Sequence, residues 1–165
     1  TEAVVYGILE AAACPVILDA DGINVLAGHI DRLDKVSVPV ILTPHQGEFQ
    51  RIGGDLTKDR ITAAREMAEK TGGVIVLKGY RTVVAGPDGR VYVNSTGNPG
   101  MATGGSGDVL SGILTCLVGQ GMEPVQAAAA AVWIHGAAGD AAAARLGIRS
   151  MLPTDMIGAL SEILM

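Results

Sequence analysis

The sequence predicts an α/β fold: a single domain over residues 1–165, with a mainly parallel sheet flanked by helices. Short, continuous apolar runs of the kind found in buried parallel strands alternate with segments of helical periodicity. Two further apolar runs flank Gly86-Pro87-Asp88-Gly89 and indicate a β-hairpin. The length of 165 residues is ordinary for one domain.

The individual elements follow from spacing and from Gly and Pro punctuation. Buried strands are expected at 15–18, 38–42 and 74–77, and the hairpin strands at 82–85 and 90–93. Helices are expected at 3–13, 58–71, 106–120 and 124–146, and a last one after Pro153 with Thr154 as its N-cap. Because ligands bind beyond the carboxyl ends of parallel strands, the polar segments that follow the three buried strands are candidate site segments.

Composition excludes several classes of function. The chain is 48% hydrophobic but only 3% aromatic, so its core must be aliphatic and rich in alanine. A net charge of −5 without a basic run argues against a nucleic-acid partner. The alanine-rich stretch after Pro124 is interrupted by Gln126, His135 and Asp140, which argues against a membrane span. With only Cys14 and Cys116, neither a disulfide framework nor a metal site is expected, and a reducing cytoplasm is the default.

A glycine-rich segment, residues 97–108, carries the most informative chemistry. Asp108 is the only charged residue between Val91 and Met122, and it follows the last glycine and opens an apolar run. Glycines and a helix N-terminus together favour an anion. A carboxylate at that point could take a proton from a hydroxyl near the terminal phosphate of a nucleotide. The alternative is a helix-terminal carboxylate that only complements the helix dipole.

This segment also carries a family resemblance. Gly104-Gly105-Ser106-Gly107-Asp108 resembles the G-x-G-D signature of ribokinase-like proteins, and 94–114 resembles the ADP/ATP-dependent NAD(P)H-hydrate dehydratases among them. Three further stretches agree in the family's order: 18–24, 42–49 and 77–82. The resemblance covers essentially the whole chain. It implies a ribokinase-like fold of which residues 1–165 are about the C-terminal two-thirds. About a hundred N-terminal residues of the family domain would then be on a separate chain, or have been removed, or be missing because this sequence is a fragment.

For the glycine-rich segment, the resemblance implies specific roles. Asp108 would contact the hydrated nicotinamide substrate and deprotonate its ring hydroxyl. Gly105, Ser106 and Gly107 would offer N–H groups to the transferring phosphoryl group, and Gly107 would also contact the nucleotide.

The segment Lys78-Gly79-Tyr80-Arg81-Thr82 matches the family pattern K-G-x-x-T, which lines the adenine nucleotide. Lys78 or Arg81 would offset the charge of the polyphosphate, whereas Tyr80 and Arg81 occupy positions at which the family varies. Without the resemblance, Lys78 could be an edge lysine and Gly79 a simple bend.

The pattern T-P-H-x-G-E at 43–48 makes His45 a substrate contact by resemblance, although such a histidine alone is more often a local hydrogen-bonding group. Glu48 is either a surface helix carboxylate or a water-mediated ligand of Mg²⁺. Gln46 departs from the proline that the family usually has there.

Three polar residues, Asp19, Asp21 and Asn24, follow the first strand. Asn24 is the best candidate to contact a ligand, because aspartates in such a position are commonly turn residues. His135, on the alanine-rich helix, is expected to be a satisfied core or interface histidine without a functional role.

The resemblance implies dehydration of hydrated NAD(P)H back to NAD(P)H, with ADP or ATP as co-substrate and Mg²⁺. It also implies a homo-oligomer and a companion NAD(P)H-hydrate epimerase domain or protein. Two alternatives remain open from the residues: a small-molecule kinase of the same superfamily, such as a vitamin-precursor kinase, and a non-catalytic nucleotide-binding subunit or fragment.

Overall fold

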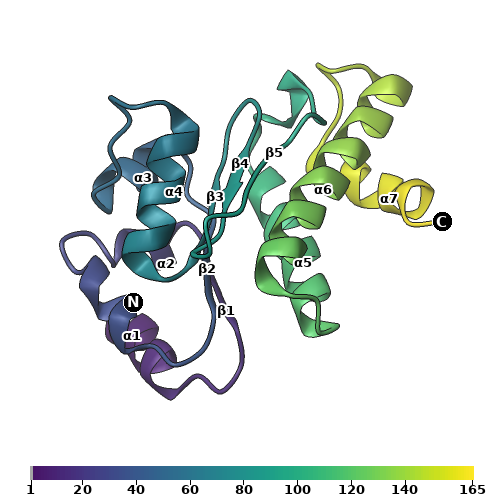
Figure 1. Ribbon diagram of the computed structural model, residues 1–165. Helices are drawn as coiled ribbons and strands as arrows, with labels where there is room; N and C mark the ends of the chain where they lie inside the picture. Colours follow the sequence, from purple (N-terminus) through teal and green to yellow (C-terminus); the bar gives the residue numbers. More distant parts are fainter. Residues whose placement is uncertain (1) are drawn as a thin grey trace. The chain divides into compact units, whose positions relative to one another are not determined.

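The computed structural model of the protein describes residues 2–165 and contains two compact units, which divide after Val93. The first unit holds all the strands of the described chain, and the second, Asn94–Met165, is helical (Figure 1). The α/β fold class is confirmed, whereas a single domain over 1–165 stays a prediction.

The first unit is built on a five-stranded mixed sheet of order β1-β2-β3-β4-β5. The first three strands are parallel and the last two form the antiparallel hairpin that the sequence predicts. Their bounds are β1 Val16–Leu18, β2 Val40–Leu42, β3 Val74–Leu77, β4 Val83–Ala85 and β5 Val91–Val93. In register, Leu18 pairs with Leu42 and Leu42 with Ile75. The carboxyl ends of β1, β2 and β3 therefore lie at one edge of the sheet.

Helices of the first unit lie along one face of this sheet (Figure 1). They are α1 Glu2–Ala11, α2 Asp21–Asn24, the 3-10 helix η1 Ile30–Lys35, α3 Gln46–Arg51 and α4 Arg60–Thr71. The sequence predicts α1 and α4 but not α2, η1 or α3, because four to six residues are too few to show a helical period. The core between helices and sheet is aliphatic apart from Phe49, which is fully buried, and Tyr6.

The second unit contains the 3-10 helix η2 Pro99–Met101 and the helices α5 Ser106–Gly119, α6 Pro124–Leu146 and α7 Pro153–Ile163. The prediction of Thr154 as an N-cap is wrong. Leu152 is the N-cap residue and Pro153 is the first helical residue, a position that suits proline because its missing N–H has no partner to lose there. The carboxylate of Asp155 accepts the Leu152 N–H at 2.8 Å.

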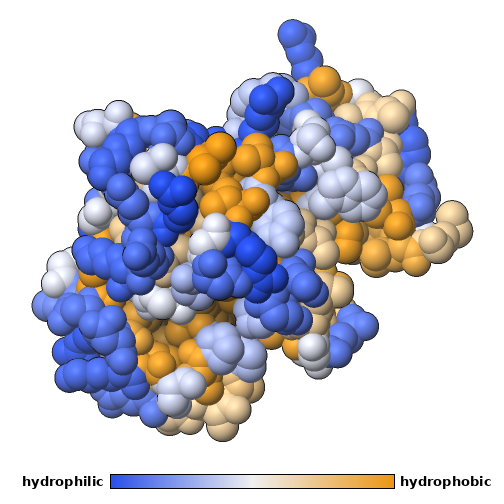
Figure 2. Space-filling model, viewed as in Figure 1, coloured by the Kyte–Doolittle hydropathy of each residue, from blue (hydrophilic) through white to orange (hydrophobic). Residues whose placement is uncertain are grey.

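The surface is mixed in polarity. Figure 2 shows hydrophilic residues over much of one face, with apolar residues exposed near α7, where Ile157 and Leu164 are more than half exposed. No helix within residues 2–165 combines the length and the apolar character that crossing a membrane requires.

The start of α4 depends on a single carboxylate. Asp59 Oδ1 accepts the N–H groups of Ile61 and Thr62, each at 3.0 Å. Hydrogen bonds from the Thr62 side chain and backbone, with a smaller contribution from Ile61, lower the pKa of Asp59 below 3.8.

We expect Asp59→Ala to lower the Tm at about pH 7, because two helix-terminal amides lose their acceptor. A carboxyl whose folded-state pKa is lowered stabilises the fold above its unfolded pKa and loses this effect as the pH falls through the folded pKa. The Tm difference between wild type and variant should therefore shrink below about pH 3.8. Thermal melts at successive pH values check this, and a Tm difference that stayed constant in acid would contradict it.

Candidate functional site

The polar segments of the first unit leave the sheet at the same edge. Asp19 follows β1, Thr43 follows β2 and Lys78 follows β3, each directly after the last residue of its strand. Because the three strands are parallel and in register, the three loops begin side by side. This is the edge at which α/β sheets bind ligands.

Hydrogen bonds join these three loops. The Thr43 hydroxyl and N–H both donate to the Leu18 carbonyl, at 3.2 and 3.1 Å. The Lys78 N–H donates to the Pro44 carbonyl at 2.8 Å. The Lys78 ammonium donates to Asp19 Oδ1 at 2.6 Å. The three loops therefore form one hydrogen-bonded network.

The Asp19–Lys78 ion pair is largely screened from water, since the two side chains are 19% and 21% exposed. Asp19 Oδ1 also accepts the N–H of Ala20, a non-glycine residue with φ of 49°. The pair gives Asp19 a structural role and fixes the ammonium of Lys78 at this edge of the sheet. An ammonium has three donors, so others remain for a phosphate oxygen.

Asn24 is held by a residue that no sequence motif singles out. Arg51, the last residue of α3, donates to Asn24 Oδ1 at 2.7 Å, and Asn24 donates to Asp21 Oδ1 at 3.3 Å. Arg51 gives no signal in the sequence, because its partner lies 27 residues away.

His45 and Glu48 form a reciprocal cap at the start of α3. His45 Nδ1 accepts the N–H groups of Gly47 and Glu48, at 3.0 and 3.3 Å, and Glu48 Oε2 accepts the His45 N–H at 2.8 Å. An accepting Nδ1 assigns the proton of the neutral ring to Nε2, which lies 3.3 Å from Glu48 Oε1. His45 is a local hydrogen-bonding group whose side chain is 54% exposed. The surface-carboxylate alternative for Glu48 is wrong, because its side chain is only 6% exposed.

The turn 78–82 has an unusual backbone. Gly79 has φ of 148° and Arg81, which carries a side chain, has φ of 52°. The Thr82 hydroxyl bridges the turn, donating to the Gly79 carbonyl at 3.0 Å and accepting its N–H at 3.3 Å. Tyr80 is 85% exposed. The turn thus presents backbone groups and an exposed aromatic ring at the same edge as Lys78.

The glycine-rich segment lies in the second unit and opens α5. Gly105 is the N-cap, with φ of 92°, and Asp108 is the third helical residue. The Ser106 N–H donates weakly to the Thr103 carbonyl, at 3.3 Å. Among residues 2–165, no acceptor is found for the N–H groups of Gly107 and Asp108 and no partner for the exposed Asp108 carboxylate. A helix terminus with free amides beside a free carboxylate can bind an anion and accept a proton.

Helix α6 supports this segment through two polar residues. Asp140 accepts the Gly97 N–H at 2.8 Å and the Asn98 side-chain N–H at 2.9 Å. His135 Nε2 lies 2.9 Å from the Ser106 carbonyl oxygen and 3.3 Å from its hydroxyl. His135 is therefore a satisfied histidine, but one that holds the first residue of α5. Nothing in the sequence indicates this contact, because the two residues are 29 positions apart.

The predicted site residues thus fall into two groups. The first unit brings together Asn24, His45, Glu48 and the segment 78–82, and the second unit holds Gly105–Asp108. No cluster of three or more His, Cys, Asp or Glu side chains suited to a metal ion occurs in the part of the chain that the structure describes.

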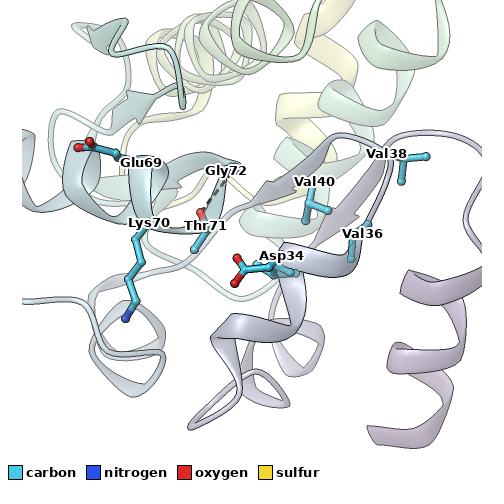
Figure 3. A pocket seen from close by; sticks show the side chains of 10 residues that line it. Asp34, Val36, Val38, Val40, Glu69, Lys70, Thr71 and Gly72 are labelled. Atoms are coloured by element: carbon cyan, nitrogen blue, oxygen red, sulfur yellow. Dashed lines mark hydrogen bonds between the residues drawn. The ribbon is translucent and has the colours of Figure 1, made fainter.

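A separate cavity of about 380 Å³ lies at the opposite end of the sheet (Figure 3). Its lining includes Val40, the first residue of β2, and Gly73, which precedes β3. The amino ends of the strands face it, so none of the predicted site residues belongs to it.

Comparison with known proteins places the chain in a family. The family model described as NAD(P)H-hydrate dehydratase matches residues 2–162. The chain belongs to the NAD(P)H-hydrate dehydratase family. The resemblance stated from four short motifs is thereby confirmed.

Individual relatives agree with the family match. The chain is 46% identical over 161 residues to the bifunctional NAD(P)H-hydrate repair enzyme of Moorella thermoacetica, covering 95% of this chain and 30% of the relative. The ADP/ATP-dependent NAD(P)H-hydrate dehydratase of Bacillus subtilis, co-crystallised with ATP and Mg²⁺, superposes with a TM-score of 0.85 at 39% identity, over 94% of this chain and 56% of that one. A ribokinase-like superfamily protein of Enterococcus faecalis gives a TM-score of 0.83 at 30% identity, over 99% and 57%.

The ribokinase-like fold class is therefore confirmed. The chain spans between about one third and three fifths of the length of these relatives.

Proposed function

We propose that the protein dehydrates hydrated NADH or NADPH back to the reduced dinucleotide, with ADP or ATP as phosphoryl donor. The observation that carries the proposal is the family match over residues 2–162, together with a free carboxylate and free amides at the start of α5. The proposed activity belongs to nicotinamide nucleotide repair, as does the function for which the Moorella relative is named.

Asp108 is the proposed general base. It takes the proton of the ring hydroxyl, whose oxygen then bonds to the terminal phosphorus of the nucleotide as the bridging P–O bond breaks. ATP leaves as ADP, and ADP as AMP. The phosphorylated carbon then loses inorganic phosphate, the neighbouring ring carbon loses a proton, and the ring double bond forms again. Phosphate is a far better leaving group than hydroxide, which explains why a kinase-like site would serve a dehydration.

The N–H groups of Gly105, Ser106 and Gly107 are the proposed donors to the transferring phosphoryl group, and the Asp108 N–H is a further one. Of these four, only the Ser106 N–H already has an acceptor among residues 2–165, the Thr103 carbonyl at 3.3 Å. The segment Lys78–Thr82 would line the adenine nucleotide, with Lys78 or Arg81 offsetting polyphosphate charge. His45 and Asn24 are proposed substrate contacts. His45 is held in place by Gly47 and Glu48, and Asn24 by Arg51 and Asp21.

Magnesium fits this chain as an ion carried by the nucleotide phosphates. The described residues offer no carboxylate cage, and both oxygens of Glu48 lie against His45. Mg²⁺ keeps several waters and takes few protein ligands, so Glu48 would contribute only through water. When bound, the ion would neutralise phosphate charge.

We also propose a cytoplasmic, homo-oligomeric enzyme that works with an NAD(P)H-hydrate epimerase domain or protein. The two cysteines, both free and exposed, support a reducing compartment. The Moorella relative is named as bifunctional, which supports a companion activity.

The experiment that distinguishes a dehydratase from a kinase measures which product contains the phosphoryl group transferred from the nucleotide. The protein, expressed from its complete gene, is incubated with hydrated NADH, Mg²⁺ and either ADP or ATP, and phosphorus NMR records the products. We expect inorganic phosphate in a one-to-one ratio with nucleotide consumed. A stable phosphorylated substrate would instead identify a kinase, and unchanged nucleotide would support a non-catalytic binding protein.

A further inference from the structure

Arg60, the first residue of α4, contacts the turn 77–81 at four points of its backbone. Nη2 donates to the carbonyls of Leu77, at 2.7 Å, and Lys78, at 3.3 Å. Nη1 donates to the Tyr80 carbonyl and lies 3.5 Å from that of Arg81. All these residues belong to the first unit.

The guanidinium group is also partly buried. Its Nε atom is inaccessible to water and has no hydrogen-bond partner, and burial lowers the pKa of Arg60. A partly buried, incompletely paired cation is unfavourable unless strong hydrogen bonds to its other atoms offset its desolvation. The four carbonyls supply those bonds, so the turn and Arg60 stabilise each other.

The direction of these bonds matters for anion binding. In a trans peptide the C=O and N–H groups point in opposite directions. A guanidinium that gathers the carbonyls of residues 77, 78, 80 and 81 on one side therefore turns the N–H groups of residues 78, 79, 81 and 82 away from it. The Lys78 N–H already donates to the Pro44 carbonyl and the Gly79 N–H to the Thr82 hydroxyl. The N–H groups of Arg81 and Thr82, which have no acceptor among residues 2–165, are therefore the ones left for an anion. The guanidinium also keeps four partially negative oxygens away from any phosphate that approaches the turn.

The contacts also account for the backbone of the turn. Arg81 adopts the left-handed conformation, which is unfavourable for a residue with a side chain. A Cβ on Gly79 would lie 3.1 Å from Arg60 Nη2, so the guanidinium packs directly on the glycine.

We propose that Arg60 is a positioning residue for nucleotide binding: it holds the carbonyls of the turn 77–81 so that the opposite side of the turn accepts the nucleotide. This inference rests on the proposed function, because it assigns the turn to the ADP or ATP co-substrate. The proposal assigns Arg60 no contact with the reacting atoms.

The test compares three variants of the protein expressed from its complete gene. Arg60→Gln removes both the charge and the planar guanidinium with its two donating nitrogens, whereas Arg60→Lys keeps the charge but loses the guanidinium. Arg65→Gln removes an exposed arginine of the same helix and is the matched control. Calorimetry with ADP and with ATP measures binding without turnover. Steady-state kinetics measure the KM of the nucleotide and of hydrated NADH.

We expect Arg60→Gln to weaken nucleotide binding by at least about tenfold, the scale of one lost charged hydrogen bond. Arg60→Lys should be intermediate and Arg65→Gln within about twofold of wild type. The KM for hydrated NADH should change less than about twofold in all three. Hydrogen exchange should accelerate in residues 77–83 of Arg60→Gln, because the carbonyls that order the turn lose their donor.

Two results would overturn the inference: a folded Arg60→Gln that binds nucleotide as wild type does, or equal losses for nucleotide and hydrated NADH. If Arg60→Gln does not fold, Arg60→Lys is judged by the same criteria. The inference and the proposed function can also be separated. If the wild-type protein binds nucleotide through a turn that depends on Arg60 but has no dehydratase activity, the inference is supported and the proposed function is contradicted. A wild-type protein that binds neither nucleotide would overturn both.

Discussion

Asp108→Asn is expected to lower kcat by about 10²–10⁴-fold, because the amide cannot accept the hydroxyl proton. Affinity for ADP and ATP should be kept or slightly improved, since a negative charge is removed from a site that binds phosphate. The Asp108 carboxylate has no partner within residues 2–165, so its loss should leave the Tm almost unchanged. Steady-state kinetics, calorimetry and thermal melts measure the three effects.

Asp155→Asn is the matched control, because Asp155 is the corresponding third residue of α7. Its carboxylate accepts the Leu152 N–H, so this substitution should lower the Tm and leave kcat unchanged. If Asp108 only complemented the helix dipole, both variants would lower stability and neither would abolish turnover. A kcat of Asp108→Asn above about a tenth of the wild-type value would therefore remove Asp108 as general base.

Gly136→Ala is expected to lower the free energy of unfolding by about 1–3 kcal/mol, although alanine favours helices. Gly136 is buried in α6, and a Cβ there would collide with the Thr96 side chain and lie 2.8 Å from the Thr96 carbonyl carbon. Because the backbone at Thr96 would have to move, the segment that leads from Thr96 to the glycine-rich turn would be displaced. Urea denaturation measures the change.

Gly158→Ala is the control for this prediction. Gly158 lies in α7, and a Cβ added there would meet nothing within 4 Å, so alanine should raise the free energy of unfolding by about 0.5–1 kcal/mol. The two substitutions are the same in chemistry and are expected to have opposite signs. A Gly136→Ala protein as stable as wild type would mean that α6 and the segment at Thr96 are not in close contact.

Most of the fold could be predicted because its elements carry local signals. The apolar runs at β1, β2 and β3 and the periodicity of α1, α4, α5 and α6 are visible in the sequence, and Gly86–Gly89 marks the hairpin. The elements that were missed, such as α3, are short. At α3 the decisive signal was the pair His45 and Glu48, which satisfies the capping pattern with a histidine in place of serine or threonine.

The residues of the candidate site also divide into those that a local sequence signal marks and those that only the tertiary fold brings into place. Glycines and a lone carboxylate predict the turn at Asp108 because their chemistry is local. The partners of Lys78 and Ser106, in contrast, lie 59 and 29 positions away and follow only from the tertiary fold. Arg60 was missed because it binds backbone carbonyls, which every residue carries and no sequence pattern marks.

The most direct measurement is the recovery of reduced-nicotinamide absorbance from hydrated NADH and hydrated NADPH, with Mg²⁺ and with ADP, ATP or neither. The protein is expressed from its complete gene and compared with Asp108→Asn. We predict recovery that requires a nucleotide, releases one phosphate for each dinucleotide restored, and is nearly abolished in the variant. Recovery without nucleotide, or no recovery from a wild-type protein that binds nucleotide, would contradict the proposed dehydratase.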